Sequence, residues 1–127
     1  MAMRLLVATA LSLVVASTAL GAGSGTSLRI VVRANATAPA RITTLRCNPA
    51  GGTVPKPAEA CRRLLSAGRA IFAPTPSDSL CTEIYGGPQE ALVTGTLRGA
   101  KIWARFRRRD GCEIARWNRV AFLLANA

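Results

Sequence analysis

The chain has 127 residues and a formal net charge of +11, from 17 Lys and Arg against 6 Asp and Glu, and it contains no histidine. Without histidine the sequence cannot form a Ser-His-Asp triad or a Cys-His pair, and its acidic residues form no close pair of carboxylates. These features favour a binding protein over an enzyme, and we expect no cofactor.

The N-terminus has the layout of a secretory signal peptide. Met1 to Arg4 supplies one positive charge, Leu5 to Val15 is almost entirely apolar, and small residues follow. The alternative, a membrane anchor, is disfavoured because the apolar stretch falls short of the roughly 20 residues that span a bilayer. We therefore expect removal of residues 1–21, leaving one secreted, extracellular domain over 22–127, with a flexible tail over 22–27 and no membrane attachment.

The hydrophobic pattern of the remaining chain predicts both strands and helices. In chain order, we expect strands over 27–33 and 38–47, a turn over 48–52, a helix over 58–68, an irregular connection over 71–80, a hairpin of strands 91–97 and 101–106, a short helical turn over 110–116 and a closing strand over 120–124. The helix is favoured by Pro57 near its start and Gly68 at its end. The expected fold is α+β, an antiparallel sheet of about five strands with one longer and one short helix and two disulfides.

The four cysteines are most simply explained as two disulfides in a secreted domain of this size. Three pairings are possible, and the spacing favours Cys47 with Cys61 and Cys81 with Cys112, because both loops are then local. Each disulfide contributes roughly 3 to 4 kcal/mol to stability. A zinc site is the alternative, but the chain has no CxxC spacing and no histidine. We therefore expect no metal ion.

Arginine clusters lie at Arg62–Arg63, at Arg105 with Arg107–Arg109, and at Arg116 with Arg119. A surface of this kind attracts nucleic acid, the anionic cell envelope or acidic proteins. The simpler interpretation is a solvated, arginine-rich face.

The aromatic residues near these clusters are predicted to be structural. Trp103 and Phe106 could stack on bases, but their alternation with the arginines is more typical of the buried face of a strand. Trp103, Trp117 and Phe122 are expected in the core or in a dimer contact.

Several motifs resemble the Streptomyces subtilisin inhibitor family over nearly the whole mature chain. The matching segments are Cys47-Asn48-Pro49-Ala50-Gly51-Gly52-Thr53-Val54-Pro55, Ala60-Cys61, Cys81-Thr82-Glu83-Ile84-Tyr85, Gly95 with Gly99, and Cys112-Glu113. The resemblance implies a secreted inhibitor of serine proteases with the same two disulfides, which forms a homodimer through its sheet.

The resemblance also implies a reactive site. The family's scissile bond lies between the second and third residues after the third cysteine, which here are Glu83 (P1) and Ile84 (P1′). An extended segment offers its backbone groups to a protease as an added strand, and anchoring it before binding raises affinity and favours religation. Loop contacts are expected from Leu80 (P4), Thr82 (P2) and Tyr85 (P2′), with pinning of the loop as the alternative role of Tyr85. Loop support is expected from Cys81, Cys112 and Asp110.

The sequence departs from the family at three places around this site. Glu83 stands where familiar members have Met, Lys or Arg, Gly86-Gly87-Pro88 stands where an Asp-Pro usually follows the tyrosine, and Asp110 replaces an asparagine that supports the loop. An unpaired carboxylate in an apolar S1 pocket is costly, whereas a cationic or polar pocket pairs with it. We therefore hypothesise a preference for Glu-specific serine proteases, with weak inhibition of subtilisin-like proteases through Leu80 as the fallback. The alternative is a secreted basic module that binds polyanions on an inhibitor-like scaffold without inhibitory activity.

Overall fold

The computed structural model describes residues 25–124, and the expected signal peptide at 1–21 lies outside this range. Within the described residues, five strands form one antiparallel sheet in the order β3-β2-β1-β4-β5. The strands are β1 (Thr26–Arg33), β2 (Arg41–Cys47), β3 (Gly51–Gly52), β4 (Glu90–Leu97) and β5 (Ala100–Phe106). The predicted α+β class with a five-stranded antiparallel sheet is therefore confirmed.

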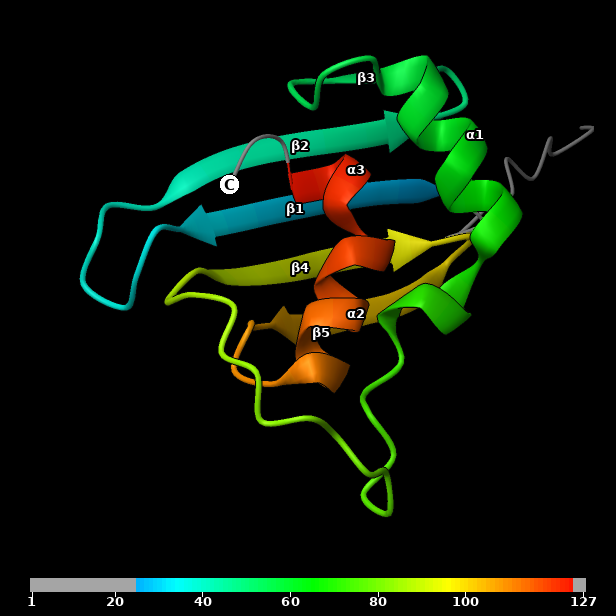
Figure 1. The fold of residues 1–127 in the computed structure, drawn as a ribbon. Coiled ribbons are helices and arrows are strands. Elements are labelled where there is room, and N and C mark those ends of the chain that lie inside the picture. Colours follow the sequence, from blue (N-terminus) through cyan, green and yellow to red (C-terminus); the bar gives the residue numbers. More distant parts are fainter. Residues whose placement is uncertain (1–24, 125–127) are drawn as a thin grey trace, which may run out of the picture.

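Helices cover one face of this sheet (Figure 1). They are α1 (Pro57–Ala67), the short 3-10 helix η1 (Arg69–Phe72), α2 (Gly111–Arg119) and α3 (Ala121–Leu124). Helix α1 begins at the proline that predicts its start, and it ends at Gly68, whose N–H donates to the Leu64 carbonyl oxygen at 2.9 Å. Alternate residues of each long strand face these helices, as the period of a half-buried strand requires.

The core lies between the sheet and the helices. Its largest fully buried side chains are Leu28 and Ile30 of β1, Leu45 of β2, Val93 and Leu97 of β4, Phe106 of β5, Leu64 of α1 and Leu123 of α3, together with Val54 and Val120 outside these elements. Each large apolar side chain buried in this way contributes about 1.5 to 3 kcal/mol. The core positions the segment between η1 and β4 at one end of the molecule.

The prediction of a closing strand over 120–124 is wrong, because this segment is helical. The Leu123 N–H donates to the Val120 carbonyl oxygen at 2.8 Å, and residues Ala121–Leu124 form α3. Val120, Leu123 and Leu124 are all buried, and their spacing places them on one side of a helix. Within residues 25–124, β5 is therefore the last strand.

Two boundaries also differ from expectation. The fifth strand is β3 at Gly51–Gly52, inside the segment predicted to be a turn, where it pairs with Leu45 and Arg46 of β2. Strand β1 begins at Thr26, so the last two residues of the expected tail over 22–27 belong to the sheet. The buried Thr26 hydroxyl accepts a hydrogen bond from the Arg98 N–H at 3.1 Å.

The sequence analysis expected Trp103 on the buried face of β5, and this prediction is wrong. It is 66% exposed, whereas Ile102, Ala104 and Phe106 are buried. Trp103 and Phe106 are three residues apart, so the alternation of a strand places them on opposite faces. Trp117 is buried and Phe122 packs against the core. Trp103 instead lies on the face of the sheet that the helices leave open.

The two disulfides pair as the spacing favours. Cys47 with Cys61 joins the end of β2 to α1, and Cys81 with Cys112 joins the segment before β4 to α2, with Cα–Cα distances of 5.7 and 5.3 Å. Both connections cross between elements that are separate in the chain.

Among the helices of residues 25–124, none has both the length and the apolar character needed to cross a membrane.

Candidate functional site

Loop 73–89 connects η1 to β4 and projects from one end of the molecule (Figure 1). It holds the residues that the sequence predicts to contact a protease. Leu80 is fully exposed, Ile84 and Tyr85 are 62% and 65% exposed, and Thr82 and Glu83 are exposed as well. A run of accessible side chains that includes three large apolar ones is suited to binding in the cleft of another protein.

The side chain of Glu83 has no partner within residues 25–124. Neither of the two ion pairs in this part of the chain involves it, and no hydrogen bond reaches its carboxylate. Its negative charge is therefore free to pair with a group on a binding partner.

The upstream side of Glu83 is held by two contacts with the start of α2. Cys81 is disulfide-bonded to Cys112, and the Gly111 N–H donates to the Thr82 carbonyl oxygen at 2.9 Å. The approach is close enough that a Cβ atom on Gly111 would overlap the Thr82 hydroxyl. Glycine at this position therefore allows the loop to lie directly against the helix.

The downstream side of the same segment is held by Gly86. Its N–H donates to the Arg108 carbonyl oxygen at 2.7 Å. A Cβ atom on Gly86 would lie 2.8 Å from Ile114 Cγ1, which is closer than such atoms pack, and 3.1 Å from Arg108 Cβ, which is a tight contact. Residues 83–85 are consequently flanked by anchored residues, Thr82 upstream and Gly86 downstream, and this limits their conformational freedom before any partner binds.

Replacing Gly111 by alanine is expected to destabilise the domain by about 1 to 3 kcal/mol, because the added methyl group forces Thr82 away from α2. Hydrogen exchange of the residue-111 amide should accelerate as its bond to Thr82 weakens. Gly25→Ala is the matched control, since an added Cβ there meets nothing within 4 Å, and its effect should stay within about 0.5 kcal/mol. Equal exchange and equal stability in the two variants would contradict the proposed close contact.

Arg116 holds the beginning of the loop. Its side chain is buried, and its Nε donates to the Ala73 carbonyl oxygen at 2.9 Å. Its Nη1 donates to the Arg105 carbonyl oxygen at 3.1 Å and to Glu113 Oε2 at 3.0 Å. The guanidinium carbon also lies 4.7 Å from the centre of the Phe106 ring. One side chain of α2 thus joins the loop to β5 through charge-assisted hydrogen bonds.

The carboxylate of Glu113 extends this network to the loop itself. Its Oε1 accepts a hydrogen bond from the Thr75 hydroxyl at 3.4 Å, while Oε2 accepts from Arg116. Because the Arg116 side chain is only 8% exposed, screening by water is weak and the pair is stronger than an ion pair on the surface. The upstream leg of the loop is therefore tied to α2 at Ala73, Thr75 and Cys81.

An Arg116→Lys variant is expected to lose about 2 kcal/mol of unfolding free energy, because an ammonium group cannot replace the planar fork that reaches three oxygens. Denaturant unfolding measures this loss. Arg119→Lys makes the same chemical change at an exposed position in the last turn of α2 and should be near neutral. If the two variants unfold alike, the buried network contributes nothing specific.

Asp110 acts on the helix rather than directly on the loop. Its Oδ1 accepts a hydrogen bond from the Glu113 N–H at 2.9 Å, which caps the N-terminus of α2. A carboxylate oxygen of Asp110 lies within 4.8 Å of the sulfurs of Cys81 and Cys112. Those sulfurs are bonded to each other and offer no thiolate to a metal ion. Asp110 therefore supports the loop only by orienting the helix that carries Gly111 and Cys112.

The sequence analysis missed the residues that do most of this positioning. Arg116 was assigned to a surface cluster, and neither Gly86 nor Gly111 was expected to contact a neighbouring element. One signal was available for Arg116, since Glu113 precedes it by three residues, a spacing at which opposite charges meet on a helix.

A family model described as subtilisin inhibitor-like matches residues 12–108 of the chain. The chain belongs to the subtilisin inhibitor-like family. The match includes all five strands and the whole of loop 73–89, whereas α2 and α3 lie beyond it. Membership of the subtilisin inhibitor-like family makes the protein a protease inhibitor and not an enzyme.

The structure is also similar to a chain in the crystal structure of Streptomyces caespitosus sermetstatin in complex with Bacillus licheniformis subtilisin. The TM-score is 0.53 with 25% sequence identity, over 81% of this chain and 99% of that chain. A search of curated proteins gave no match.

Proposed function

We propose that this protein is secreted and inhibits a serine protease by substrate-like binding of loop 73–89, with Glu83-Ile84 as the scissile bond. The observation that carries the proposal is the exposed segment 83–85 held on both sides, by Thr82 and Cys81 upstream and by Gly86 downstream. The likeness to an inhibitor in complex with a subtilisin supports a serine protease as partner.

The anchoring explains how such a segment inhibits instead of being consumed. A free peptide loses conformational entropy when it enters an active site, whereas a segment already held at both ends loses little, so its affinity is higher. Backbone groups of the bound segment pair with the enzyme as an added strand. If the bond is cut, the disulfide and the two backbone hydrogen bonds keep the new ends close to each other, which favours religation over release.

The charge of the loop supports a target with a cationic specificity pocket. Loop 73–89 contains Asp78 and Glu83 and no Lys or Arg, in a chain whose net charge is +11. A Glu-specific serine protease must stabilise a carboxylate in its S1 pocket, and a cationic or polar group there would pair with Glu83. We therefore place Glu-specific serine proteases first among the targets, with subtilisin-like proteases second.

The test is a titration of the oxidised, folded protein against a subtilisin, a trypsin, a chymotrypsin and a Glu-specific serine protease at stoichiometric concentrations. Tight inhibition of the Glu-specific enzyme alone is the expected result. Inhibition of the subtilisin alone would keep the mechanism and reject the proposed specificity. No inhibition of any of the four by the folded protein would reject the proposed function.

Polyanion binding is a second candidate function, supported by exposed arginines. Arg62, Arg63, Arg105, Arg109 and Arg119 are all exposed, and none forms an ion pair within residues 25–124. Nucleic acid or an anionic surface would bind them with a steep salt dependence. Retention on heparin that is unchanged by Glu83→Ala, combined with no inhibition of proteases, would favour this function.

We also propose that the protein forms a homodimer through the open face of its sheet. Val31 lies at the centre of this face, opposite Ile42 on β2 and Leu92 on β4, and Ile42 and Trp103 are 49% and 66% exposed. A second copy of the chain would cover this apolar row. Arg105 lies at its edge opposite Leu92, so salt should strengthen association by screening like charges.

An Ile42→Lys variant is expected to raise the dimer dissociation constant at least about tenfold, because it adds a charge to the apolar row. Sedimentation equilibrium over a range of concentrations measures the change. Ser66→Lys adds the same charge at an exposed position on α1 and should leave association intact. A monomer at every concentration of the unaltered protein would reject the dimer.

A further inference from the structure

A groove lies beside the primed side of the proposed scissile bond. Its volume is about 430 Å³, and its walls include Tyr85, residues 87–90, residues 35–37 and Arg107–Arg109. Because Tyr85 directly follows Ile84 in the chain, a protease bound at Glu83-Ile84 would extend over the groove. The groove is therefore continuous with the surface on which the enzyme is proposed to dock.

The lining of the groove is positively charged. Three arginines face one carboxylate, Glu90, which leaves two positive charges in excess. Glu90 Oε1 lies 3.6 Å from Arg107 Nε, so this pair neutralises one arginine only. Arg108 donates to the neutral Gln89 Oε1 at 3.4 Å, and Arg109 is exposed and forms no ion pair with any described residue.

Two donors beside the groove are unused. Arg107 Nε and Arg108 Nε are buried and have no hydrogen-bond partner; the 3.6 Å contact of Arg107 with Glu90 is an ion pair but is too long for a hydrogen bond. Most buried polar groups in proteins are hydrogen-bonded. Because these two Nε atoms are buried, a docked anion would contact only the exposed parts of the half-buried Arg107 and Arg108 side chains.

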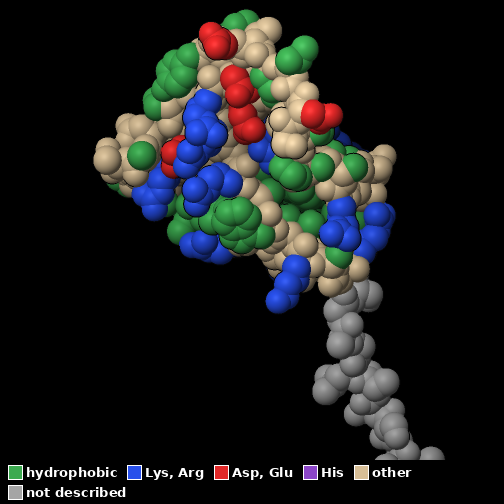
Figure 2. Space-filling view, turned by 90° about the horizontal axis from the view of Figure 1, so that it is seen from below, with side chains coloured by type: hydrophobic (Ala, Val, Ile, Leu, Met, Phe, Trp, Pro, Cys, Tyr) green, Lys and Arg blue, Asp and Glu red, His purple; other side chains and the backbone are tan. Residues whose placement is uncertain are grey.

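We infer that this groove binds an acidic surface segment of the inhibited protease, beyond its S2′ subsite. Carboxylates form charge-assisted hydrogen bonds with guanidinium groups, and complementary charge also accelerates association. Figure 2, which views the molecule from below relative to Figure 1, shows several Lys and Arg side chains gathered on one side of this end. The inference rests on the proposed function, because it requires the enzyme to dock at Glu83-Ile84.

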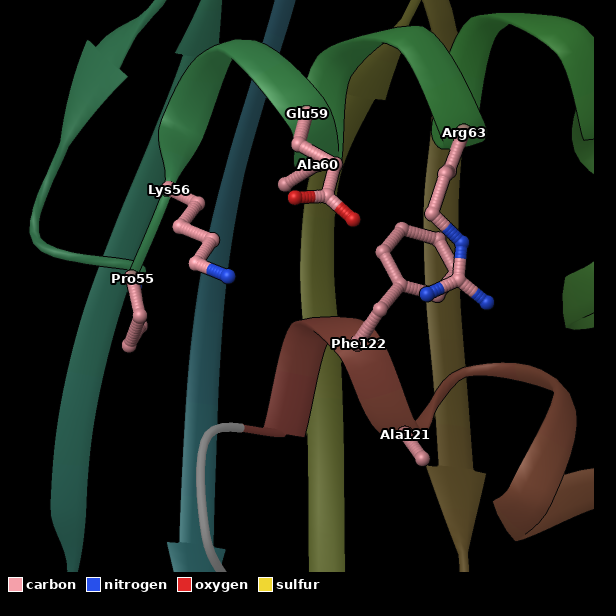
Figure 3. Close-up of a pocket in the computed structure, with 7 residues that line it drawn as sticks. All are labelled: Pro55, Lys56, Glu59, Ala60, Arg63, Ala121 and Phe122. Carbon is pink, nitrogen blue, oxygen red and sulfur yellow. The ribbon is translucent and has the colours of Figure 1, made fainter.

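A second hollow on the surface offers a weaker case for a binding site. The hollow between α1 and α3 is lined by Lys56, Glu59, Arg63 and Phe122, with the guanidinium carbon of Arg63 4.4 Å from the centre of the Phe122 ring (Figure 3). Opposite charges there balance in part, and nothing in its geometry selects one class of ligand. The groove beside Tyr85 is distinguished from it by its excess positive charge.

The direct test uses a fluorescein-labelled hexaglutamate peptide and fluorescence anisotropy at low ionic strength. The Arg107→Gln/Arg109→Gln protein is expected to bind this peptide about tenfold more weakly than the unaltered protein. The matched control is Arg46→Gln/Arg69→Gln, which removes the same charge from exposed positions on β2 and η1. Its binding should change less than about twofold. Arg109→Gln alone leaves the pair between Arg107 and Glu90 intact and replaces the double variant if that variant fails to fold.

A second measurement connects the groove to the enzyme. The association rate of the protease that the unaltered protein inhibits most tightly is measured for the unaltered protein, for the Arg107→Gln/Arg109→Gln protein and for the control variant. The Arg107→Gln/Arg109→Gln protein should associate more slowly than the other two, and the difference should shrink as salt is added.

The outcomes separate the two proposals. Equal peptide binding by the two double variants overturns the groove as an acidic-peptide site. Equal association rates for the unaltered protein and the Arg107→Gln/Arg109→Gln protein overturn the assignment of the groove to the protease. If the peptide still requires Arg107 and Arg109 but the unaltered protein inhibits no protease, the proposed function fails and the specificity of the groove for acidic peptide stands.

Discussion

A Glu83→Leu variant is expected to inhibit a subtilisin about 100-fold more tightly than the unaltered protein and to lose a comparable factor toward a Glu-specific serine protease. The carboxylate of Glu83 has no partner in residues 25–124, so whichever pocket receives it must stabilise it. An apolar pocket leaves the charge unpaired at a large cost in free energy, whereas a cationic pocket forms a charge-assisted hydrogen bond. Inhibition constants for both enzymes, measured on the same protein preparations, report the two changes.

Two further variants separate charge from position. Glu83→Gln keeps the length of the side chain and removes its charge. It should therefore inhibit the Glu-specific enzyme more weakly than the unaltered protein, and inhibit the subtilisin less tightly than Glu83→Leu does. Asp78→Asn removes a charge from another exposed position of loop 73–89 and should leave both constants within about threefold. Identical inhibition of both enzymes by Glu83→Leu and the unaltered protein would show that Glu83 does not enter the S1 pocket.

Removal of the Cys81–Cys112 disulfide is expected to weaken inhibition about 100- to 1000-fold, through loss of preorganisation of the loop. In the Cys81→Ser/Cys112→Ser protein, the hydrogen bond from Gly111 to Thr82 still joins the residue before Glu83 to α2, while the other described contacts with α2 lie farther upstream at Ala73 and Thr75. The unfolding free energy should fall by about 3 to 4 kcal/mol, because the bond closes a loop with a sequence separation of 31. Denaturant unfolding and inhibition constants measure the two effects separately.

The other disulfide provides the matched control. Cys47→Ser/Cys61→Ser opens a loop with a sequence separation of 14, far from loop 73–89 in the fold, and should cost about 3 kcal/mol of stability. Under conditions in which it is folded, its inhibition constant should remain within about threefold of the unaltered value. Were both double variants to inhibit equally well when folded, the disulfide at Cys81 would have no special role in ordering the loop.

The parts of the fold that the sequence predicts well are those set by local signals. Strands β4 and β5 alternate clearly on either side of Arg98 and Gly99, whose φ angles of 47° and 80° form the tight turn between them. Helix α1 starts at Pro57 and ends before Gly68. In both cases the residues that specify the element lie within it or next to it.

The errors arise where local signals are ambiguous. Val120 to Leu124 is a short apolar run, and such a run fits a buried strand and a buried helix equally well. Contact with the sheet decides the outcome, because Val120 and Leu123 enter the core together only in a helix. The error at Trp103 was different, since the alternation itself, counted from Phe106, already assigns it to the open face.

In the candidate site, too, local patterns in the sequence predict some features and contacts between distant residues decide the others. The position of the exposed residues was predicted from the spacing of the third cysteine together with the family resemblance. The groups that hold them come from distant parts of the chain: Arg116 reaches Ala73, and Gly86 reaches Arg108. Contacts of this kind depend on how α2 packs against the loop, which no local pattern specifies.

The order of the strands has a consequence for when the domain folds. Strand β1 is the first in the chain, yet it lies at the centre of the sheet, between β2 and β4. Its pairing of Ser27 with Thr96 and Arg33 with Glu90 joins segments that are far apart in sequence, and such non-local contacts form late and slowly. In a chain that leaves the cell from its N-terminus, as proposed here, the sheet cannot close until residues 90–97 have followed.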